Sequence, residues 1–457
     1  MGTEKARNSA GALKASLNGG NAKHQQLRPS WLTEIISFIL CTTSPFAVIY
    51  YWIAYRYFDT SIVTAAKAVY SEGPFQFFAT RLPHSSADAI LGYAGWLTLQ
   101  AILYIYLPGS EALGPVTPAG RRLKYKLNGL AAWGATVVLW AVGSVSGIID
   151  PACIAKNWEG LVWTINVFSV VAVVLFHIKA RIMPDNEAET FITGSFWYDF
   201  FEGGELHPRI GKTWDWRQFF CTRTGGILAW TLIDVSFAAY QYQSHGYLTN
   251  TMVAVVTLRV FVVVDFFINE LWFFHTLDGM YESFGFYNIY GFSAMMPVLW
   301  SLQTQYLAKR PEELSTIALT SVILLFLAGW LIRFSADYQK MKFRQTGGEC
   351  RIWGNKANKI RASYQIADGK LCHSLLLCSG WWGLARHANY TGSAMYTLAL
   401  CAACGRGGIF PYTEAIIVGG IVIHRCYRDE GKCAAKYGKD WDEYCRQVQW
   451  RMIPGIY

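Results

Sequence analysis

The clearest shortage in this 457-residue chain is charge, because only 16% of its residues are Asp, Glu, Lys or Arg. Soluble domains carry about a quarter of such residues. Hydrophobic residues make up 53% of the chain, and several runs reach the ~20 apolar residues that a helix needs to cross a bilayer. No long polar linker separates these runs. The composition therefore excludes a soluble globule and predicts one polytopic membrane domain.

Regular cysteine spacing is also missing. The eleven cysteines follow no repeated interval, which argues against a disulfide scaffold. Cys401 and Cys404 have the spacing of a redox or zinc pair, but they lie inside an apolar helix candidate with no second pair nearby. Small buried thiols explain them better, so we predict no metal site.

The first 30 residues lack a hydrophobic core, and this excludes a secretory signal peptide. Their polar, slightly basic composition predicts a disordered cytosolic tail over residues 1–30. The remainder is predicted to be all-α, a polytopic membrane helix bundle of about ten transmembrane segments. The apolar runs occupy 32–55, 89–107, 127–149, 160–178, 226–243, 249–274, 286–306, 315–335, 374–405 and 409–424. Glycines cluster in the last two runs, which predicts that this C-terminal pair is broken or re-entrant.

The net charge of +9 raises nucleic acid as a partner. The basic residues, however, gather beside the apolar runs, as the positive-inside rule describes. This pattern favours a membrane protein over a nucleic-acid-binding one, and it predicts that both termini are cytosolic. We expect 31–335 to form the transmembrane bundle and 336–457 to form a cytosol-facing region with the last helix pair.

Familiar nucleotide-binding and hydrolase motifs are absent from the sequence. No Gly-x-Gly-x-x-Gly follows a strand, and there is no P-loop, His-Glu-x-x-His or Gly-x-Ser-x-Gly. The C-terminal fifth nevertheless carries cations, amides and aromatic rings suited to a large phosphorylated cofactor. These residues are Lys340, Arg344, Trp382, Arg386, Asn389, Tyr390, Arg425, Asp429, Lys436 and Tyr437. A basic collar of snorkelling side chains with interfacial aromatics is the alternative.

Several charges fall within or beside the apolar runs, where an unpaired charge costs a few kcal/mol. They are Asp234, Arg259, Asp265, Glu270 and Glu414. We expect Arg259 to pair with one of the acids. A rigid loop at 201–211 is predicted from Pro208 and its glycines, with Glu205 and Arg209 forming an ion pair that pins it.

Four motifs carry a family resemblance. They are Gly-Glu-Leu-His-Pro-Arg-Ile-Gly at 204–211, Leu-Leu-Cys-Ser-Gly-Trp-Trp-Gly-Leu-Ala-Arg-His-Ala-Asn-Tyr at 376–390, Arg-Asp-Glu at 428–430 and Pro-Gly-Ile-Tyr at 454–457. From about residue 32 to Tyr457 the chain resembles the membrane sterol reductase family, whose members act on the C14, C24(28) or Δ7 bond. Within that family it is most similar to the Δ7-sterol (7-dehydrocholesterol) reductases.

The resemblance implies a multi-pass enzyme of the endoplasmic reticulum membrane that takes its sterol from the bilayer and uses NADPH. The transmembrane bundle of 31–335 is then expected to form the sterol pocket, and the cytosol-facing region of 336–457 is expected to bind NADPH. Association with membrane lipid and with other sterol-biosynthesis enzymes is also expected. By resemblance, cofactor binding falls on Lys340, Arg344, Leu377, Trp382, Asn389, Tyr390, Asp429, Cys433, Lys436, Tyr437 and Tyr444. The 2′-phosphate of NADPH is expected to meet Lys340 or Arg344.

The implied reaction is reduction of the Δ7 bond of a 5,7-diene sterol such as 7-dehydrocholesterol. An alkene without a carbonyl accepts hydride poorly, so it must first be protonated by an acid in a dry pocket. The candidate acids are Asp429, Glu270 and Asp278, with Tyr390 able to relay a proton. Asp429 ranks first because Arg425, one turn away, can orient it.

Three alternatives remain open. A Δ14-sterol reductase would share these motifs. A membrane methyltransferase that uses S-adenosylmethionine would share the final helix pair with its basic rim, although its cofactor has no diphosphate and needs fewer cations. A non-catalytic sterol-binding scaffold would not need the residues predicted to bind a cofactor. These residues are all present here, which argues against a scaffold.

Overall fold

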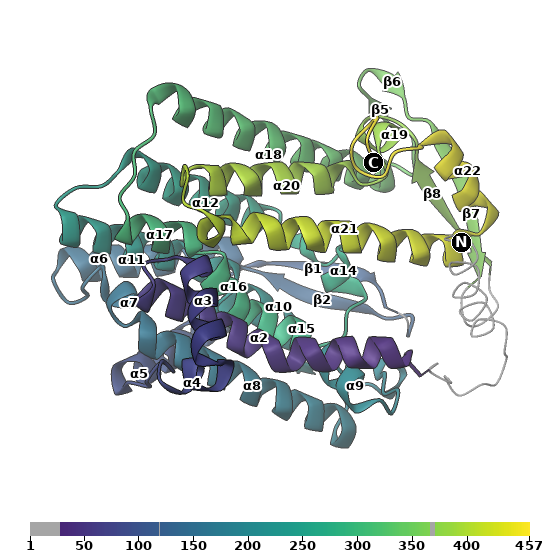
Figure 1. Ribbon diagram of the computed structural model, residues 1–457. Coiled ribbons are helices and arrows are strands. Elements are labelled where there is room, and N and C mark those ends of the chain that lie inside the picture. Colours follow the sequence, from purple (N-terminus) through teal and green to yellow (C-terminus); the bar gives the residue numbers. More distant parts are fainter. Residues whose placement is uncertain (1–27, 118, 366–370) are drawn as a thin grey trace. The chain divides into compact units, whose positions relative to one another are not determined.

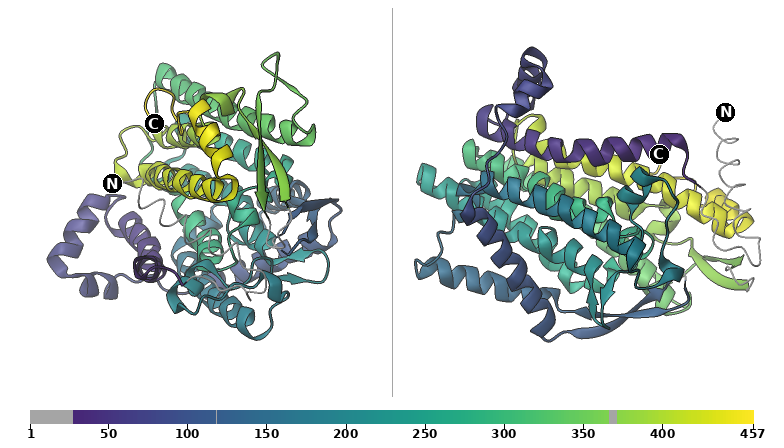
Figure 2. Two further views of the ribbon diagram at one scale, coloured as in Figure 1. Left: turned by 90° about the vertical axis from the view of Figure 1, so that its right-hand side faces the viewer. Right: turned by 90° about the horizontal axis from the view of Figure 1, so that it is seen from below.

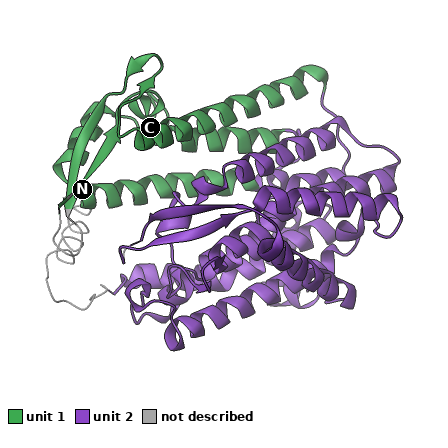
Figure 3. Cartoon of the chain, turned by 180° about the vertical axis from the view of Figure 1, so that it is seen from behind, with its two compact units in different colours: residues 1–27, 315–402, 414–457 green, residues 28–314, 403–413 purple. Residues whose placement is uncertain are grey.

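The computed structural model describes residues 28–117, 119–365 and 371–457, and it is mostly helical. The chain divides into two compact units, coloured separately in Figure 3. Unit 1 holds residues 315–402 and 414–457, and unit 2 holds residues 28–314 and 403–413. The tail predicted over 1–30 lies outside the described residues, except for its last three.

Unit 2 contains five long helices, all labelled in Figure 1. They are α2 (Trp31–Tyr57), α5 (Ala87–Tyr106), α8 (Trp158–Ile182), α11 (Ile227–His245) and α12 (Asn250–Ile268). Hydroxyl caps fix several of their starts. Ser86, for example, accepts a hydrogen bond from the backbone N–H of Ala89, which satisfies one of the free donors at the start of α5.

Shorter helices connect and extend these five. They are α3 (Ile62–Glu72), α4 (Pro74–Ala79), α6 (Gly129–Val145), α7 (Cys153–Lys156), η1 (Glu187–Glu189), α9 (Phe196–Glu202), α10 (Trp216–Phe219), η2 (Phe220–Thr224), α13 (Glu270–Phe273), α14 (Leu277–Met280), α15 (Phe286–Tyr290), η3 (Gly291–Met295), α16 (Met296–Leu299) and α17 (Leu302–Lys309). The run predicted as one span over 286–306 is therefore broken into four pieces. Both η2 and η3 are π-helical turns, which insert an extra residue and often mark functional sites.

Two antiparallel hairpins belong to unit 2. In the larger, β1 (Ser110–Val116) pairs with β2 (Arg122–Leu127); in the smaller, β3 (Arg209–Ile210) pairs with β4 (Trp214–Asp215). The larger hairpin is drawn as two crossing arrows in Figure 1. The prediction of an all-α fold was therefore too simple, because polar alternating stretches between the apolar runs form strands.

Unit 1 is built on α18 (Thr316–Gln345), α20 (Ala388–Ala402) and most of α21 (Ile409–Tyr437). Its smaller elements are β5 (Arg351–Ile352), β6 (Asn355–Lys356), β7 (Lys359–Gln365), β8 (Leu371–Leu377), α19 (Trp381–Leu384) and α22 (Lys439–Gln447). Strand β5 pairs with β6, and β7 pairs with β8, each in an antiparallel hairpin. Both views of Figure 2 show the long β7–β8 hairpin.

The C-terminal pair differs from the predicted spans. Residues 374–377 are strand rather than membrane helix, because the apolar run there is the buried edge of the β7–β8 hairpin. The first helix of the pair is interrupted, since α19 ends at Leu384 and α20 begins at Ala388. The second is not, and α21 continues through Gly419 and Gly420 as one helix of 29 residues. The prediction of a broken pair was therefore right for the first member only.

Six helices are long and apolar enough to cross a membrane: α2, α5, α8, α12, α18 and α21. The shorter α6 is also apolar. The predicted count of about ten spans is therefore not confirmed among the described residues. Four predicted runs have no counterpart among the six. Runs 286–306 and 374–405 are broken, 127–149 forms the 17-residue α6, and 226–243 forms α11, which is not among the apolar spans.

A pair of glycines lets α18 and α20 approach closely. A Cβ atom on Gly329 would lie 2.6 Å from the backbone nitrogen of Tyr396, and one on Gly392 would meet the backbone of Arg333 at 2.5 Å. Small residues at such positions allow helix backbones to touch in membrane proteins. The two helices accordingly run side by side in Figures 1 and 3.

Candidate functional site

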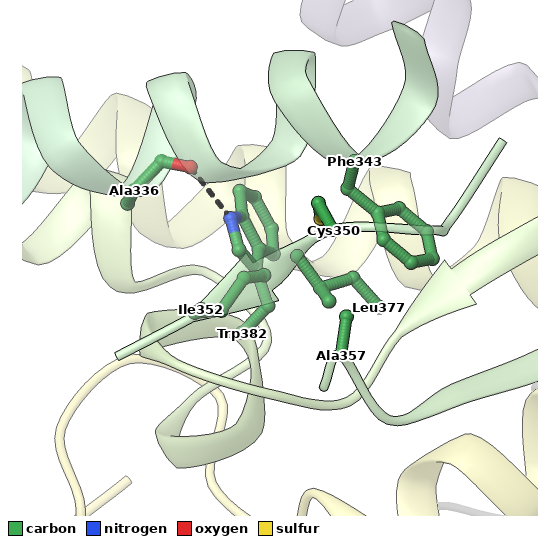
Figure 4. Packing of buried hydrophobic residues seen from close by; sticks show 7 residues of the cluster. All are labelled: Ala336, Phe343, Cys350, Ile352, Ala357, Leu377 and Trp382. Carbon is green, nitrogen blue, oxygen red and sulfur yellow. Dashed lines mark hydrogen bonds between the residues drawn. The ribbon is translucent and has the colours of Figure 1, made fainter. Parts of the chain in front are cut away.

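The Gly-Trp-Trp-Gly turn is fastened to α18. Gly380 has φ +62°, and a Cβ atom there would collide with Gln339 and Ile352, so this position requires glycine. The backbone N–H of Trp381 donates to Gln339 Oε1 at 3.0 Å. Trp382 donates its indole N–H to the backbone carbonyl of Ala336 at 2.7 Å, as Figure 4 shows. The turn therefore presents a fixed tryptophan beneath α18.

The buried cluster in Figure 4 surrounds that tryptophan and includes Leu377. Its members are Ala336, Phe343, Cys350, Ile352, Ala357, Leu377 and Trp382. Leu377 and Trp382 are 6% and 5% exposed. Tyr444 braces the same turn from α22, where its hydroxyl donates to the carbonyl of Trp382 at 3.1 Å. Three of the predicted cofactor residues thus contribute to the floor of one site.

Lys340 covers this floor. Its Nζ lies 4.0 Å from the ring centroid of Trp382, a favourable cation–π contact. Asp429 and Cys433 from α21 are near enough to act on the Lys340 charge, as is Arg344 one turn further along α18. Arg344 itself is exposed. The structure therefore brings together cations, a carboxylate and a ring that lie up to 89 residues apart in the sequence.

A second cation–aromatic group continues along α21. Lys436 Nζ lies 4.1 Å from the ring of Tyr364 on β7 and 5.1 Å from the ring of Tyr437. The hydroxyl of Tyr437 donates to Ser374 Oγ on β8 at 3.4 Å. Cys433 and Tyr437 both pack against the buried cluster around Trp441 and Tyr444. The β7–β8 hairpin thus forms one wall of the site, which the sequence had not indicated.

The third part of the site lies at the start of α20. Asn389 Nδ2 donates to Asp337 Oδ1 at 2.9 Å, and the same carboxylate lies 3.4 Å from Arg333. Tyr390 stacks on His387, with ring centroids 5.2 Å apart and an interplanar angle of 5°. His387 Nδ1 lies 4.0 Å from Asp429 Oδ2. The candidate acid and the candidate proton relay therefore share one neighbour, His387.

His387 received no role from its sequence, although it lies inside a signature motif. It is 3% exposed, and its Nε2 has no hydrogen-bond partner among the described residues. Burial, with a further contribution from the nearby Lys340 charge, lowers the pKa of His387 to about 3. The imidazole is therefore neutral at pH 7 and is not a general acid there. Its flat face can still hold the Tyr390 ring in place.

Arg386 is committed to the protein rather than open to a ligand. Its guanidinium donates to Glu430 Oε1 at 2.8 Å and to the carbonyls of Val448 and Gln449 at 2.6 and 2.9 Å. Only 7% of its side chain is exposed. The expectation that Arg386 joins a phosphate cradle was therefore wrong. Its donors are taken up by Glu430 on α21 and by carbonyls of the C-terminal segment, so Arg386 connects these segments to the start of α20.

Two candidate acids, Glu270 and Asp278, belong to unit 2. Glu270 accepts hydrogen bonds from the backbone N–H of Gly129 and from Gln218, each at 2.9 Å, and lies 3.7 Å from Arg223. This arrangement favours a structural role for Glu270. Asp278 Oδ1 accepts from the hydroxyl of Tyr287 at 3.1 Å.

Other charges of unit 2 also pair. Arg259 lies 3.6 Å from Asp234, as expected for an intramembrane charge. The predicted pair of Glu205 and Arg209 was wrong in its partners, since Glu205 binds Lys179 at 2.9 Å and Arg209 binds Asp215 at 3.0 Å. Glu205 and Arg209 still anchor the 204–211 loop, but each does so through a partner outside the loop.

Comparison with known proteins decides among the families that could present such a site. The model of the ergosterol biosynthesis ERG4/ERG24 family matches residues 31–457. The chain belongs to this sterol reductase family. It is 36% identical to a 7-dehydrocholesterol reductase of Xenopus laevis over 100% of both chains, and 38% identical to one of Danio rerio over 93% of this chain and 92% of that one. A Delta(14)-sterol reductase of Methylotuvimicrobium alcaliphilum is 32% identical over 94% of this chain and 95% of that one.

The unit 1 cluster of this sterol reductase homologue gathers the residues that the sequence predicts to bind a cofactor. Eleven of the residues singled out from the sequence lie in unit 1 at this cluster or on the helices that build it. They are Lys340, Arg344, Leu377, Trp382, Asn389, Tyr390, Asp429, Cys433, Lys436, Tyr437 and Tyr444. Arg425 lies one turn before Asp429 on α21. Asp337, Glu430 and Tyr364 were missed. Glu430 belongs to the Arg-Asp-Glu motif but received no role, and Asp337 and Tyr364 lie outside the motifs.

Proposed function

We propose that this chain reduces a ring double bond of a sterol with NADPH, and that its bond is the Δ7 bond of a 5,7-diene such as 7-dehydrocholesterol. The observation that carries the choice of bond is identity over nearly full length. Two relatives called 7-dehydrocholesterol reductases are 36% and 38% identical, whereas the Delta(14)-sterol reductases are 30–32% identical. The margin is small, so Δ14 reduction is the second candidate.

The donor set of unit 1 fits NADPH. Lys340, Arg344 and Lys436 can bind phosphate oxygens, and the rings of Trp382 and Tyr437 offer flat faces. Lys340 and Lys436 each rest on an aromatic ring, a cation–π contact that stabilises by about 0.5–2 kcal/mol. A phosphate can replace this contact with a charge-assisted hydrogen bond to the ammonium group, which is stronger. Asp429 can accept hydrogen bonds from ribose hydroxyls. S-adenosylmethionine has no phosphate, so this many cations favours the reductase over the methyltransferase.

NADPH, when bound, supplies a hydride. The chain itself must supply a proton to the alkene, because a carbon–carbon double bond that is not conjugated to a carbonyl becomes a good hydride acceptor only once it is protonated. We assign the proton to Asp429, whose side chain is 32% exposed and therefore reachable, with Arg425 orienting it. Tyr390, held flat against His387, stands ready to relay the proton to the sterol. Glu270 is unsuited, since its oxygens are already hydrogen-bonded.

The test of this function is incubation of membranes that contain the chain with one sterol and one cofactor at a time. We expect NADPH with 7-dehydrocholesterol to give a product two mass units heavier that has lost the Δ7 bond. Product from a Δ14-unsaturated sterol alone would transfer the assignment to the second candidate. Methylated product with S-adenosylmethionine, or no product with any pair, would reject sterol reduction.

Lys340 offers a test of the cofactor assignment. A charge-assisted hydrogen bond is worth about 1.5–3 kcal/mol, so Lys340→Gln should raise the KM for NADPH about 10- to 100-fold. Lys342→Gln is the matched control, because Lys342 is exposed and its Nζ lies over Tyr338 instead. If Lys340 meets the 2′-phosphate, the variant should leave the KM for NADH unchanged. Equal losses with both cofactors would place Lys340 at the diphosphate instead.

A further inference from the structure

The tip of the β5–β6 hairpin, labelled beside α19 in Figure 1, has a strained backbone. The two strands are joined by a turn of two residues, Trp353 and Gly354, whose φ angles are +49° and +84°. Glycine and asparagine suit a turn of this kind, whereas a bulky side chain in the left-handed region is an outlier. Such strain is retained mostly at functional positions. The turn itself therefore gives no reason for a tryptophan at position 353.

Packing within unit 1 does not account for Trp353 either. Its ring meets that of Trp381 edge to face, with the centroids 5.4 Å apart, yet 57% of Trp353 remains exposed. Its neighbour Ile352 is only 6% exposed and belongs to the buried cluster of Figure 4. The hairpin is thus held in place by Ile352 and presents Trp353 to the surroundings of the protein.

A contact with α18 fixes the depth at which this tryptophan lies. Trp381 donates its indole N–H to Ser335 Oγ at 2.7 Å. From Thr316, the first residue of α18, to Ser335 the helix rises ~29 Å at 1.5 Å per residue. The hydrocarbon core of a bilayer is ~30 Å thick. Because α18 is long and apolar enough to cross a membrane, Ser335 marks the edge of the hydrocarbon, and Trp353 lies one ring contact away from that edge.

The surface of α18 carries a stripe of aromatic rings at the same depth. Trp330, Phe334 and Tyr338 follow one another at four-residue intervals, and their rings stack in sequence at 5.2 and 6.4 Å. Tyr338 is two and a half turns beyond Gly329, which contacts α20, so the stripe lies on the side of α18 away from α20. Tyrosine and tryptophan gather in this way at the boundary between water and lipid.

Basic residues surround these rings. Between positions 340 and 356 the chain has five cations and one carboxylate. Four of the cations are exposed, namely Lys342, Arg344, Arg351 and Lys356. Anionic headgroups attract such residues near a membrane surface. We propose that the tip of the β5–β6 hairpin enters the headgroup–acyl boundary of the bilayer, with Trp353 as its anchor. Through Ile352, the hairpin then connects the buried cluster below Trp382 to the membrane surface.

The test of this contact does not depend on the reaction that the chain catalyses. The full chain is labelled with 5-fluorotryptophan, placed in nanodiscs of phosphatidylcholine and phosphatidylserine, and observed by fluorine NMR. The resonance of Trp353 is the one that Trp353→Phe removes. We expect a phospholipid with a doxyl group at carbon 5 of its acyl chain to relax this resonance at least ~threefold more strongly than that of Trp441, which is buried on α22.

Two further comparisons make the result decisive. Trp441→Phe identifies the control resonance, and Trp353→Asn replaces Trp353→Phe if that variant does not fold, because asparagine suits the left-handed turn. Relaxation of Trp353 no stronger than that of Trp441 would place the ring in water or against protein and would overturn the membrane contact. Stronger relaxation by a doxyl group at carbon 16 than at carbon 5 would contradict the proposed depth at the boundary.

Discussion

The Asp429→Asn variant is expected to lose about 10²–10⁴-fold in kcat, the usual contribution of a general acid. An amide cannot deliver a proton to the alkene, yet it keeps the shape of the carboxyl group and one acceptor oxygen. The unit 1 geometry places Asp429 within reach of the Lys340 charge and of His387, and the His387 ring stacks on Tyr390. The measurement is steady-state turnover of 7-dehydrocholesterol with NADPH.

Comparing kcat with KM distinguishes the two roles that Asp429 could have. Loss of kcat with an unchanged KM for NADPH identifies the proton donor, whereas a higher KM at constant kcat identifies a cofactor ligand. Asp442→Asn on α22 is the control, because that carboxylate is exposed. Full turnover by Asp429→Asn would end its assignment as the acid, and a selective loss in Tyr390→Phe would then transfer the role to the phenol.

The second large effect concerns stability. Arg386→Met should lower the free energy of unfolding by about 3–5 kcal/mol, because it leaves Glu430, whose side chain is only 13% exposed, with the more exposed Arg451 as its remaining arginine. Three segments lose their shared anchor at once, since Arg386 also binds the carbonyls of Val448 and Gln449. Thermal unfolding of the purified chain in detergent measures the effect.

Arg451→Met is the matched control for Arg386. Arg451 binds the same carboxylate at 2.9 Å, but 35% of its side chain is exposed, so its removal should cost about 1 kcal/mol or less. Comparable losses from both variants would contradict the central role of Arg386. If NADPH stabilised the Arg386→Met protein less than it stabilises the parent chain, Arg386 would instead have a direct part in binding.

The sequence predicted the membrane class and most of the unit 1 cluster because local signals carried them. Long apolar runs correspond to α2, α5, α8, α12 and α18, and the motif at 376–390 supplies both the turn under Lys340 and the start of α20. Apolar composition alone, however, does not separate a membrane helix from a buried strand. The leucines of β8 were therefore counted as part of a span.

Side-chain partners could not be predicted, because they depend on contacts between distant segments. Arg386 has the chemistry of a phosphate ligand, and only the approach of Glu430 and the C-terminal carbonyls reveals its structural use. Glu205 has an arginine four residues away, yet it binds Lys179 from α8. The broken pair was predicted from Gly383, Gly392, Gly405, Gly407 and Gly408, but none of these glycines lies within α21, which continues as one helix.

The glycine contact between α18 and α20 restricts how this enzyme can exchange its ligands. The backbones of α18 and α20 are in contact at Gly329 and Gly392. Separating the two helices would break this contact, so we expect them to stay together as the fixed side of the site. Lys340 lies three turns beyond Gly329 on α18, and Asn389 lies one turn before Gly392 on α20, so both residues belong to this fixed side. If unit 1 binds NADPH as proposed, we expect its release to require displacement of the C-terminal half of α21 or of the β7–β8 hairpin with Lys436 and Tyr364.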